Sequence, residues 1–204
     1  MNNKVLDLNL VFSTPIWGFL VKDYTKLNIN MLEYIKELQK SNPEGVKKSN
    51  VFGWHSKNFD INKENTAKKF ATIVQQYIKK VVKDEMGWKY DSNKTIIEAM
   101  WSIINKKGSF NIQHNHPNAY LSAAYYVKFP KNSGNIKFFD PKEQKNIRYP
   151  NIKNYTDLSA AIVEITPKVG DLLIFPAYLY HAVSENLSEE DRIIISFNVD
   201  IKYT

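Results

Sequence analysis

Two histidines, His114 and His116, stand one residue apart in the segment QHNHPNAYLSAAYYV. In an extended segment, side chains at positions i and i+2 point to the same side, so both imidazoles can reach one point. Neutral imidazole is a common ligand of transition metals in proteins. Two polar residues on a turn or a surface would give the same spacing. The pair therefore indicates a metal site and leaves the surface alternative open.

A metal site needs a further ligand, and the chain offers two other histidines, His55 and His181. His181 ends the segment GDLLIFPAYLYH in the same β-rich half as the pair, where a strand end can bring it to the same barrel mouth. We expect it to be the third ligand. His55 lies in FGWHSKN in the helical half, and we interpret it as a non-ligand that could line a pocket with Trp54 and Ser56. The chain has no cysteine, which excludes thiolate ligands, disulfides and cysteine nucleophiles.

Short β-branched and aromatic segments separated by turn residues must carry these histidines. The predicted strands cover residues 94–105, 119–129, 134–140, 159–166, 170–176 and 192–201. Apolar residues at helical spacing predict helices over 28–42 and 62–87, the second capped by Asn62 and ended by Gly87. Residues 6–21 predict a strand, a break at a proline and a second strand. Helices followed by strands favour an α+β fold, a β-sandwich or barrel braced by N-terminal helices.

Composition predicts one globular domain over residues 1–204, with supporting elements in 1–93 and the β core in 94–204. The net charge is +7, but the lysines are scattered, which favours a solvated surface over a nucleic-acid partner. No apolar run is long enough to cross a bilayer, and no secretory signal is visible. Together with the lack of cysteine, this predicts a cytoplasmic protein. The polar stretch 141–158 could be a lid over a site or an inert surface loop.

Residues 98–200 resemble the iron(II)- and 2-oxoglutarate-dependent oxygenases, particularly the prolyl-hydroxylase-like branch. The motifs HNHP, AAYYVKFP, SGNIKFFDP, PKVGDLLIFPAYLYHAV and RIIISFN occur in the family's order. The HxHP motif and its surroundings resemble more narrowly a group of bacterial and phage oxygenases, and VFSTPIW extends that likeness toward the N-terminus. The resemblance implies a double-stranded β-helix, a cupin-like jelly roll.

The resemblance also implies chemistry and site residues. The enzyme would need iron(II) and 2-oxoglutarate, consume dioxygen, release succinate and carbon dioxide, and hydroxylate an unactivated C–H bond of a peptide, an amino acid or another small substrate. The catalytic metal ligands would be His114, His116 and His181. Arg192 would grip the far carboxylate of the oxoacid through two parallel hydrogen bonds. Arginine is otherwise present only at position 148, which makes Arg192 distinctive.

Several residues could complete the oxoacid site. Tyr126 and Asn105 could donate hydrogen bonds to the oxoacid, whereas Tyr125, Trp101 and Tyr120 could either join them or pack the core.

One departure from the family's pattern concerns the carboxylate that usually stands two residues after the first histidine, where this chain has His116. Three interpretations follow. The centre could hold its metal with three histidines, Asp140 could reach the metal from a neighbouring strand, or His116 could lie beside an open metal position. We favour three histidines, a set that would also hold zinc, copper or nickel.

Other functions remain as alternatives. The pattern G-x5-H-x-H from Gly108 and the pattern G-x5-P-x4-H from Gly170 resemble the two cupin motifs, which suggests a three-histidine metal enzyme that does not use 2-oxoglutarate. The cupin glutamate after the second histidine is missing, and Tyr178 replaces a glycine. A non-catalytic β-barrel binding module is a further alternative. Nucleic-acid demethylation is disfavoured because Asn198 stands where demethylases carry a second basic residue. Substrate identity and oligomeric state are not encoded in these patterns.

Overall fold

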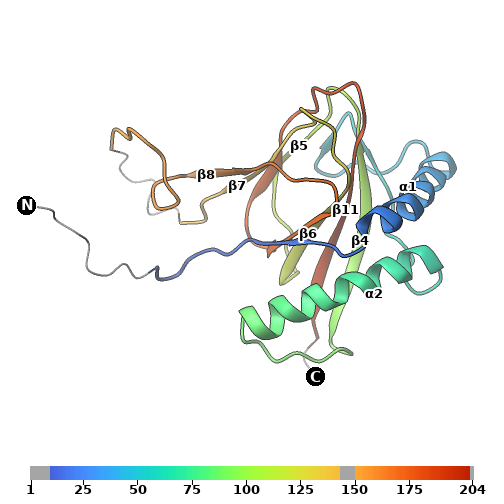
Figure 1. Cartoon of the computed structure of the whole chain (residues 1–204), viewed down its shortest axis with the longest axis horizontal. Helices are drawn as coiled ribbons and strands as arrows, with labels where there is room; N and C mark the ends of the chain where they lie inside the picture. The colour runs from blue at the N-terminus through green and yellow to red at the C-terminus, as the bar shows by residue number, and fades with distance from the viewer. Residues whose placement is uncertain (1–9, 143–149, 203–204) are drawn as a thin grey trace, which may run out of the picture.

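Two antiparallel sheets form the centre of the protein in the computed structural model, which describes residues 10–142 and 150–202. One sheet has six strands in the order β1-β9-β6-β11-β4-β3 and the other five in the order β2-β5-β10-β7-β8 (Figure 1). The larger sheet comprises β1 (Trp17–Leu20), β3 (Trp54–His55), β4 (Thr95–Asn105), β6 (Leu121–Lys128), β9 (Asp171–Pro176) and β11 (Arg192–Ile201). The smaller comprises β2 (Asn50–Val51), β5 (Phe110–His114), β7 (Ile136–Phe139), β8 (Ile162–Ile165) and β10 (His181–Val183).

Two helices cover the outer face of the six-stranded sheet (Figure 1). They are α1 (Tyr24–Ser41) and α2 (Asn65–Lys79), and α2 continues into the π-helical segment η1 (Lys80–Glu85). Phe70 on α2 packs against Tyr125 of β6, with ring centroids 5.1 Å apart. This α+β arrangement of helices and paired sheets confirms the predicted double-stranded β-helix class.

The start of α2 differs from the prediction and its end agrees with it. The helix begins at Asn65 and not after Asn62. The side chain of Asp60 accepts the backbone N–H groups of Asn62 and Lys63, which holds these residues in a turn before the helix. At the other end, Gly87 has a φ of +64°, the left-handed conformation with which glycine ends helices.

Alternation along the central strands separates two apolar layers. On β11, Ile193 and Ile195 face the helices, while Arg192 and Ile194 face the other sheet. On β6, Tyr125 likewise faces the helices, where its hydroxyl donates to Asn28 Oδ1 on α1 at 2.6 Å. On β11 the space between the sheets is thus reached by every second residue, from Arg192 to Asn198.

All six strands predicted in residues 94–201 are present within a few residues of their expected bounds. The strands that sequence reasoning missed are β2, β3, β5 and β10, which have two to five residues and little apolar pattern. In the predicted strand–break–strand of residues 6–21, the second strand is β1 and residues 10–16 form no strand. Residues 6–9 of that prediction, and residues 143–149 of the 141–158 stretch, lie outside the described residues.

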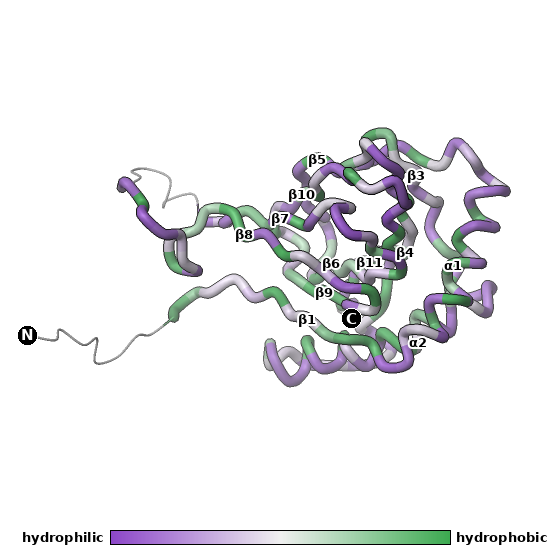
Figure 2. The backbone as a smooth tube through the Cα atoms, turned by 45° about the horizontal axis from the view of Figure 1, so that its top comes forward, coloured by the Kyte–Doolittle hydropathy of each residue, from purple (hydrophilic) through white to green (hydrophobic). Residues whose placement is uncertain are grey.

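The hairpin of β7 and β8 extends away from the body, and residues 10–16 run beside it (Figures 1 and 2). Several apolar side chains on this extension are exposed, among them Phe12 and Ile162. Within the described ranges, neither helix has the length and apolarity that a membrane crossing requires.

Candidate active site

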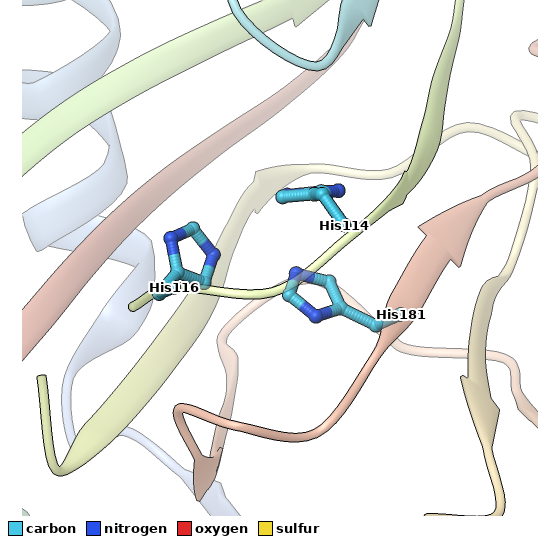
Figure 3. A group of neighbouring side chains, drawn as sticks. All are labelled: His114, His116 and His181. Atoms are coloured by element: carbon cyan, nitrogen blue, oxygen red, sulfur yellow. The ribbon is translucent and has the colours of Figure 1, made fainter. Parts of the chain in front are cut away.

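Three histidines meet between the two sheets. His114 on β5 and His181 on β10 are directly opposite each other in the antiparallel register, and His116 follows two residues after β5 ends. Each offers a ring nitrogen, and these nitrogens all lie within 4.8 Å of one another. Figure 3 shows the three rings grouped together, with His116 on the loop that follows the strand of His114. Cross-strand pairing therefore brings together residues 67 positions apart in the chain, which the sequence pattern alone could only suggest.

Backbone carbonyl groups orient two of the three rings. His114 Nδ1 lies 2.7 Å from the carbonyl oxygen of Ile112, and His181 Nδ1 lies 3.0 Å from that of Leu179. A carbonyl oxygen only accepts hydrogen bonds, so Nδ1 carries the proton in both neutral rings and Nε2 keeps its lone pair. This is the arrangement in which metal-binding histidines are commonly held.

His116 is held differently. Its backbone N–H donates to the carbonyl oxygen of Ala177 at 2.9 Å, and no described residue hydrogen-bonds to its ring. The ring instead packs on Trp101 with centroids 5.6 Å apart, and His55 stacks on Trp101 at 5.6 Å and an interplanar angle of 10°. Aromatic packing therefore takes the place of a polar contact at the position where the family's pattern expects a carboxylate.

Burial keeps these histidines neutral. The pKa of His114 is lowered, that of His116 falls to about 4 and that of His181 to about 3. Loss of hydration on burial is the largest cause for each of the three. The histidines also lower one another's pKa, because two charged imidazoles so close would repel. At neutral pH all three rings can act as ligands without first losing a proton.

We expect the free energy of unfolding of the metal-free protein to fall as the pH is lowered from 7 to 5. Histidines of the unfolded chain titrate near 6.5, whereas His116 and His181 titrate near 4 and 3 when folded. The unfolded state then binds more protons in this window, which costs up to about 1.4 kcal/mol per pH unit for each histidine. Urea unfolding at pH 7, 6 and 5 measures the slope, and His181→Phe should make it shallower. An unchanged slope in that variant would contradict this origin.

The histidines border a cavity of about 540 Å³ that both sheets line. At its buried end lie Arg192, 1% exposed, and Tyr126, 3% exposed. Arg192 Nη1 donates to the carbonyl oxygens of Ser133 at 2.7 Å and Gly134 at 2.9 Å, while its buried Nη2 has no hydrogen-bond partner among the described residues. Burial lowers the pKa of Arg192 to about 10, which still leaves it charged at neutral pH.

Gly134 is required for this anchoring of Arg192. Its φ is +87°, and an added Cβ would collide with the backbone carbonyl of Ser184. Only glycine therefore lets this turn bring its carbonyl oxygen to the guanidinium.

The other residues singled out in the sequence differ in whether they line the cavity. His55 and Trp101 line the cavity. Asn105 does not: it pairs with Arg192 in the sheet, but its amide donates to Asn111 Oδ1 at 3.1 Å, and Asn111 is the residue that reaches the cavity. Tyr125 points toward the helices, as described above.

Tyr120 and Asp140 lie away from the three histidines. Tyr120 packs against Trp88 with ring centroids 5.9 Å apart. Asp140 accepts the backbone N–H of Lys142 and lines the groove beside residues 10–16, so it is not part of the histidine group. Of the three interpretations of the centre, the geometry supports the one in which His116 joins His114 and His181.

Sequence reasoning missed the polar residues on the cavity face of β11, Ser196 and Asn198, as well as Lys48 and Asn111. The first two could have been found, since they continue the two-residue spacing that begins at Arg192. Lys48 and Asn111 carried no such signal, because they lie in or next to short strands that the pattern did not reveal.

A double-stranded β-helix with a histidine-lined metal site between its sheets defines a class of metal-dependent β-barrel enzymes, and solved structures share this fold. A prolyl-4-hydroxylase from Pseudomonas putida has a TM-score of 0.64 at 10% identity, covering 94% of this chain and 95% of that one. HygX from Streptomyces hygroscopicus, solved with nickel and 2-oxoglutarate bound, has a TM-score of 0.66 at 12% identity, covering 93% and 84%. At these identities the likeness shows the fold.

A third similar structure is a prolyl hydroxylase from Trichoplax adhaerens in complex with a peptide fragment of hypoxia inducible factor. Its TM-score is 0.61 at 15% identity, covering 91% of this chain and 83% of that one. No curated protein is significantly similar to the chain.

Residues 99–198 match the family described as "Putative 2OG-Fe(II) oxygenase". This match covers 100 of the 204 residues, and over it the chain is similar to the iron(II)- and 2-oxoglutarate-dependent oxygenases. The match supports the predicted enzyme class and cofactors, and it favours the oxygenase over the cupin enzyme and the binding module.

Proposed function

We propose that this oxygenase hydroxylates an unactivated C–H bond of a peptide, an amino acid or another small substrate, with release of succinate and carbon dioxide. His114, His116 and His181 would hold the iron, and Arg192 would anchor the far carboxylate of 2-oxoglutarate. When bound, iron and 2-oxoglutarate together supply the activation of dioxygen that the side chains cannot perform. The peptide option has support from the fold neighbour solved with a peptide.

One observation carries the proposal: two sets of polar groups without protein partners border the same cavity. The first set is the Nε2 atoms of His114 and His181 together with the ring of His116. The second is Arg192 Nη2, a buried N–H donor with no acceptor in the described protein. Buried donors are almost always satisfied, so an unpaired guanidinium nitrogen indicates a ligand. A molecule with a metal-chelating end and a carboxylate end would provide partners for both sets, and 2-oxoglutarate has that form.

The chain's own groups have defined tasks in this proposal. Carbonyl groups of Ile112 and Leu179 keep the Nε2 atoms of two ligands available for the metal. Tyr126 is fully buried next to Arg192, and burial raises the pKa of its hydroxyl, so it stays protonated and can donate to the oxoacid. Apolar side chains, among them Ile194 and Phe175, exclude water from the same end of the cavity.

The test is succinate formation by the purified protein with iron(II), 2-oxoglutarate and dioxygen, omitting one component at a time. We expect succinate only when all three are present, because the oxidative decarboxylation consumes both co-substrates at the metal. Addition of a peptide and amino-acid panel should raise the rate where a member is hydroxylated, which mass spectrometry detects as a gain of one oxygen atom. Iron binding without any succinate would instead favour the cupin-type enzyme, and failure to bind iron would favour the binding module.

A further inference from the structure

We propose that the substrate of this oxygenase carries an anionic group, a carboxylate or a phosphate, which binds at the Lys48 side of the cavity. This inference rests on the proposed function for the cavity and names the substrate class of that same site. It follows from the charges that line the cavity, from the replacement of the usual carboxylate ligand and from the position of Lys48.

The described cavity lining contains no aspartate or glutamate. Its ionisable groups are Lys48, Arg192, Tyr126 and the four histidines of the chain. The remaining polar lining is neutral and consists of serine and asparagine side chains. A cavity with two fixed cations and no anion has a positive potential, which low-dielectric walls strengthen.

The three-histidine centre increases this imbalance. Iron(II) carries two positive charges and 2-oxoglutarate two negative charges, so with Arg192 the loaded site keeps one net positive charge when all metal ligands are neutral. A carboxylate in place of His116 would have cancelled that charge. Lys48 then adds a second uncompensated positive charge at the same cavity. An anionic group on the substrate would neutralise this charge without any change in the protein.

Lys48 lines the cavity with an exposed side chain. It precedes β2, whereas Arg192, the other fixed cation of the lining, is buried. Within the described residues no carboxylate lies within ion-pair distance of Lys48. Ser49, Asn58 and Asn111 line the cavity with it and supply hydroxyl and amide groups that can donate hydrogen bonds to an oxyanion.

The electrostatics of the histidines agree with this placement. The pKa of His55 is lowered by burial first, and the charge of Lys48 contributes to that lowering. Asp171 acts on the buried Tyr126 but is not among the residues that line the cavity.

The test compares acids with their neutral counterparts of the same shape. N-acetyl-proline, N-acetyl-leucine and phenyl phosphate are titrated against N-acetyl-prolinamide, N-acetyl-leucinamide and phenol. The protein is loaded with nickel(II) and saturated with 2-oxoglutarate, which occupies Arg192, and binding is followed by ligand-observed NMR. We expect the anionic members to bind roughly two- to fivefold more tightly, the range for one exposed charge pair, and the preference to shrink in high salt.

Two lysine variants locate the effect. Lys48→Gln should remove most of the preference for the anion, while Lys47→Gln should leave it, because Lys47 is also exposed but does not line the cavity. The inference would be overturned if each acid and its neutral counterpart bound with equal affinity, or if no acid bound. It would also be overturned if Lys48→Gln and Lys47→Gln lost the preference for the acid to the same extent. The readout is binding without turnover, so a protein that forms no succinate would refute the proposed function while the anion preference is still measured. A protein that forms succinate but shows no preference would refute this inference alone.

Discussion

His181→Ala should abolish tight iron(II) binding and lower succinate formation by roughly a hundredfold or more, since the metal loses one of three protein ligands. His181 is 5% exposed and lies opposite His114 in the β5–β10 pairing, so no other described side chain can take its place. Its loss also leaves the carbonyl group of Leu179 without its donor. Anaerobic iron(II) titration gives the stoichiometry and affinity, and the succinate assay gives the rate.

The matched control for this variant is His55→Ala. His55 is also a buried histidine of the same cavity, but its Nδ1 pairs with the carbonyl oxygen of Ser56 and it is not part of the three-histidine group. We expect this variant to bind one iron per chain. Its affinity for iron should change only if Trp101, which loses its stacking partner, moves and displaces the ring of His116. If His181→Ala bound iron normally while His55→Ala did not, the assignment of the ligands would be wrong.

Arg192→Met should raise the 2-oxoglutarate concentration for half-maximal succinate formation by roughly a hundredfold, with a smaller effect on the maximal rate. Truncating one partner of a buried charge pair typically costs about 2–5 kcal/mol, because the other charge is left unpaired in a dry site. Methionine keeps much of the side-chain volume and removes the donors that the oxoacid needs. Steady-state assays over a wide range of 2-oxoglutarate measure the change, and iron titration should show normal binding.

Because Arg192 also donates to Ser133 and Gly134, its loss could disturb the turn between β6 and β7. Thermal unfolding and iron affinity detect such a change, since both would fall together with 2-oxoglutarate binding. Arg192→Lys keeps the charge but not the two-pronged geometry and should lie between the wild type and Arg192→Met. Unchanged 2-oxoglutarate dependence in a folded, iron-binding Arg192→Met variant would refute the anchoring role.

Much of the candidate site was predictable because the sequence signals are local. The one-residue spacing of His114 and His116 and the strand pattern before His181 each depend on a few adjacent positions, and the rarity of arginine is visible from the composition. The alternation of β6 could separate Tyr126 from Tyr125 only once it was known which face of the strand meets the helices. The error at the start of α2 has a similar cause: Asp60 organises a turn that outcompetes the capping residue expected at Asn62.

By itself the sequence determined the α+β class, the histidines to consider and Arg192 as one of only two arginines, because residue type and periodicity encode these directly. Only the tertiary structure decided that His114 and His181 face each other, that Asp140 lies elsewhere and that Asn111 instead of Asn105 reaches the cavity. It also placed Lys48 and the His55–Trp101 stack beside the centre. These are contacts between residues far apart in the chain, set by strand register and sheet packing, and no local pattern specifies them.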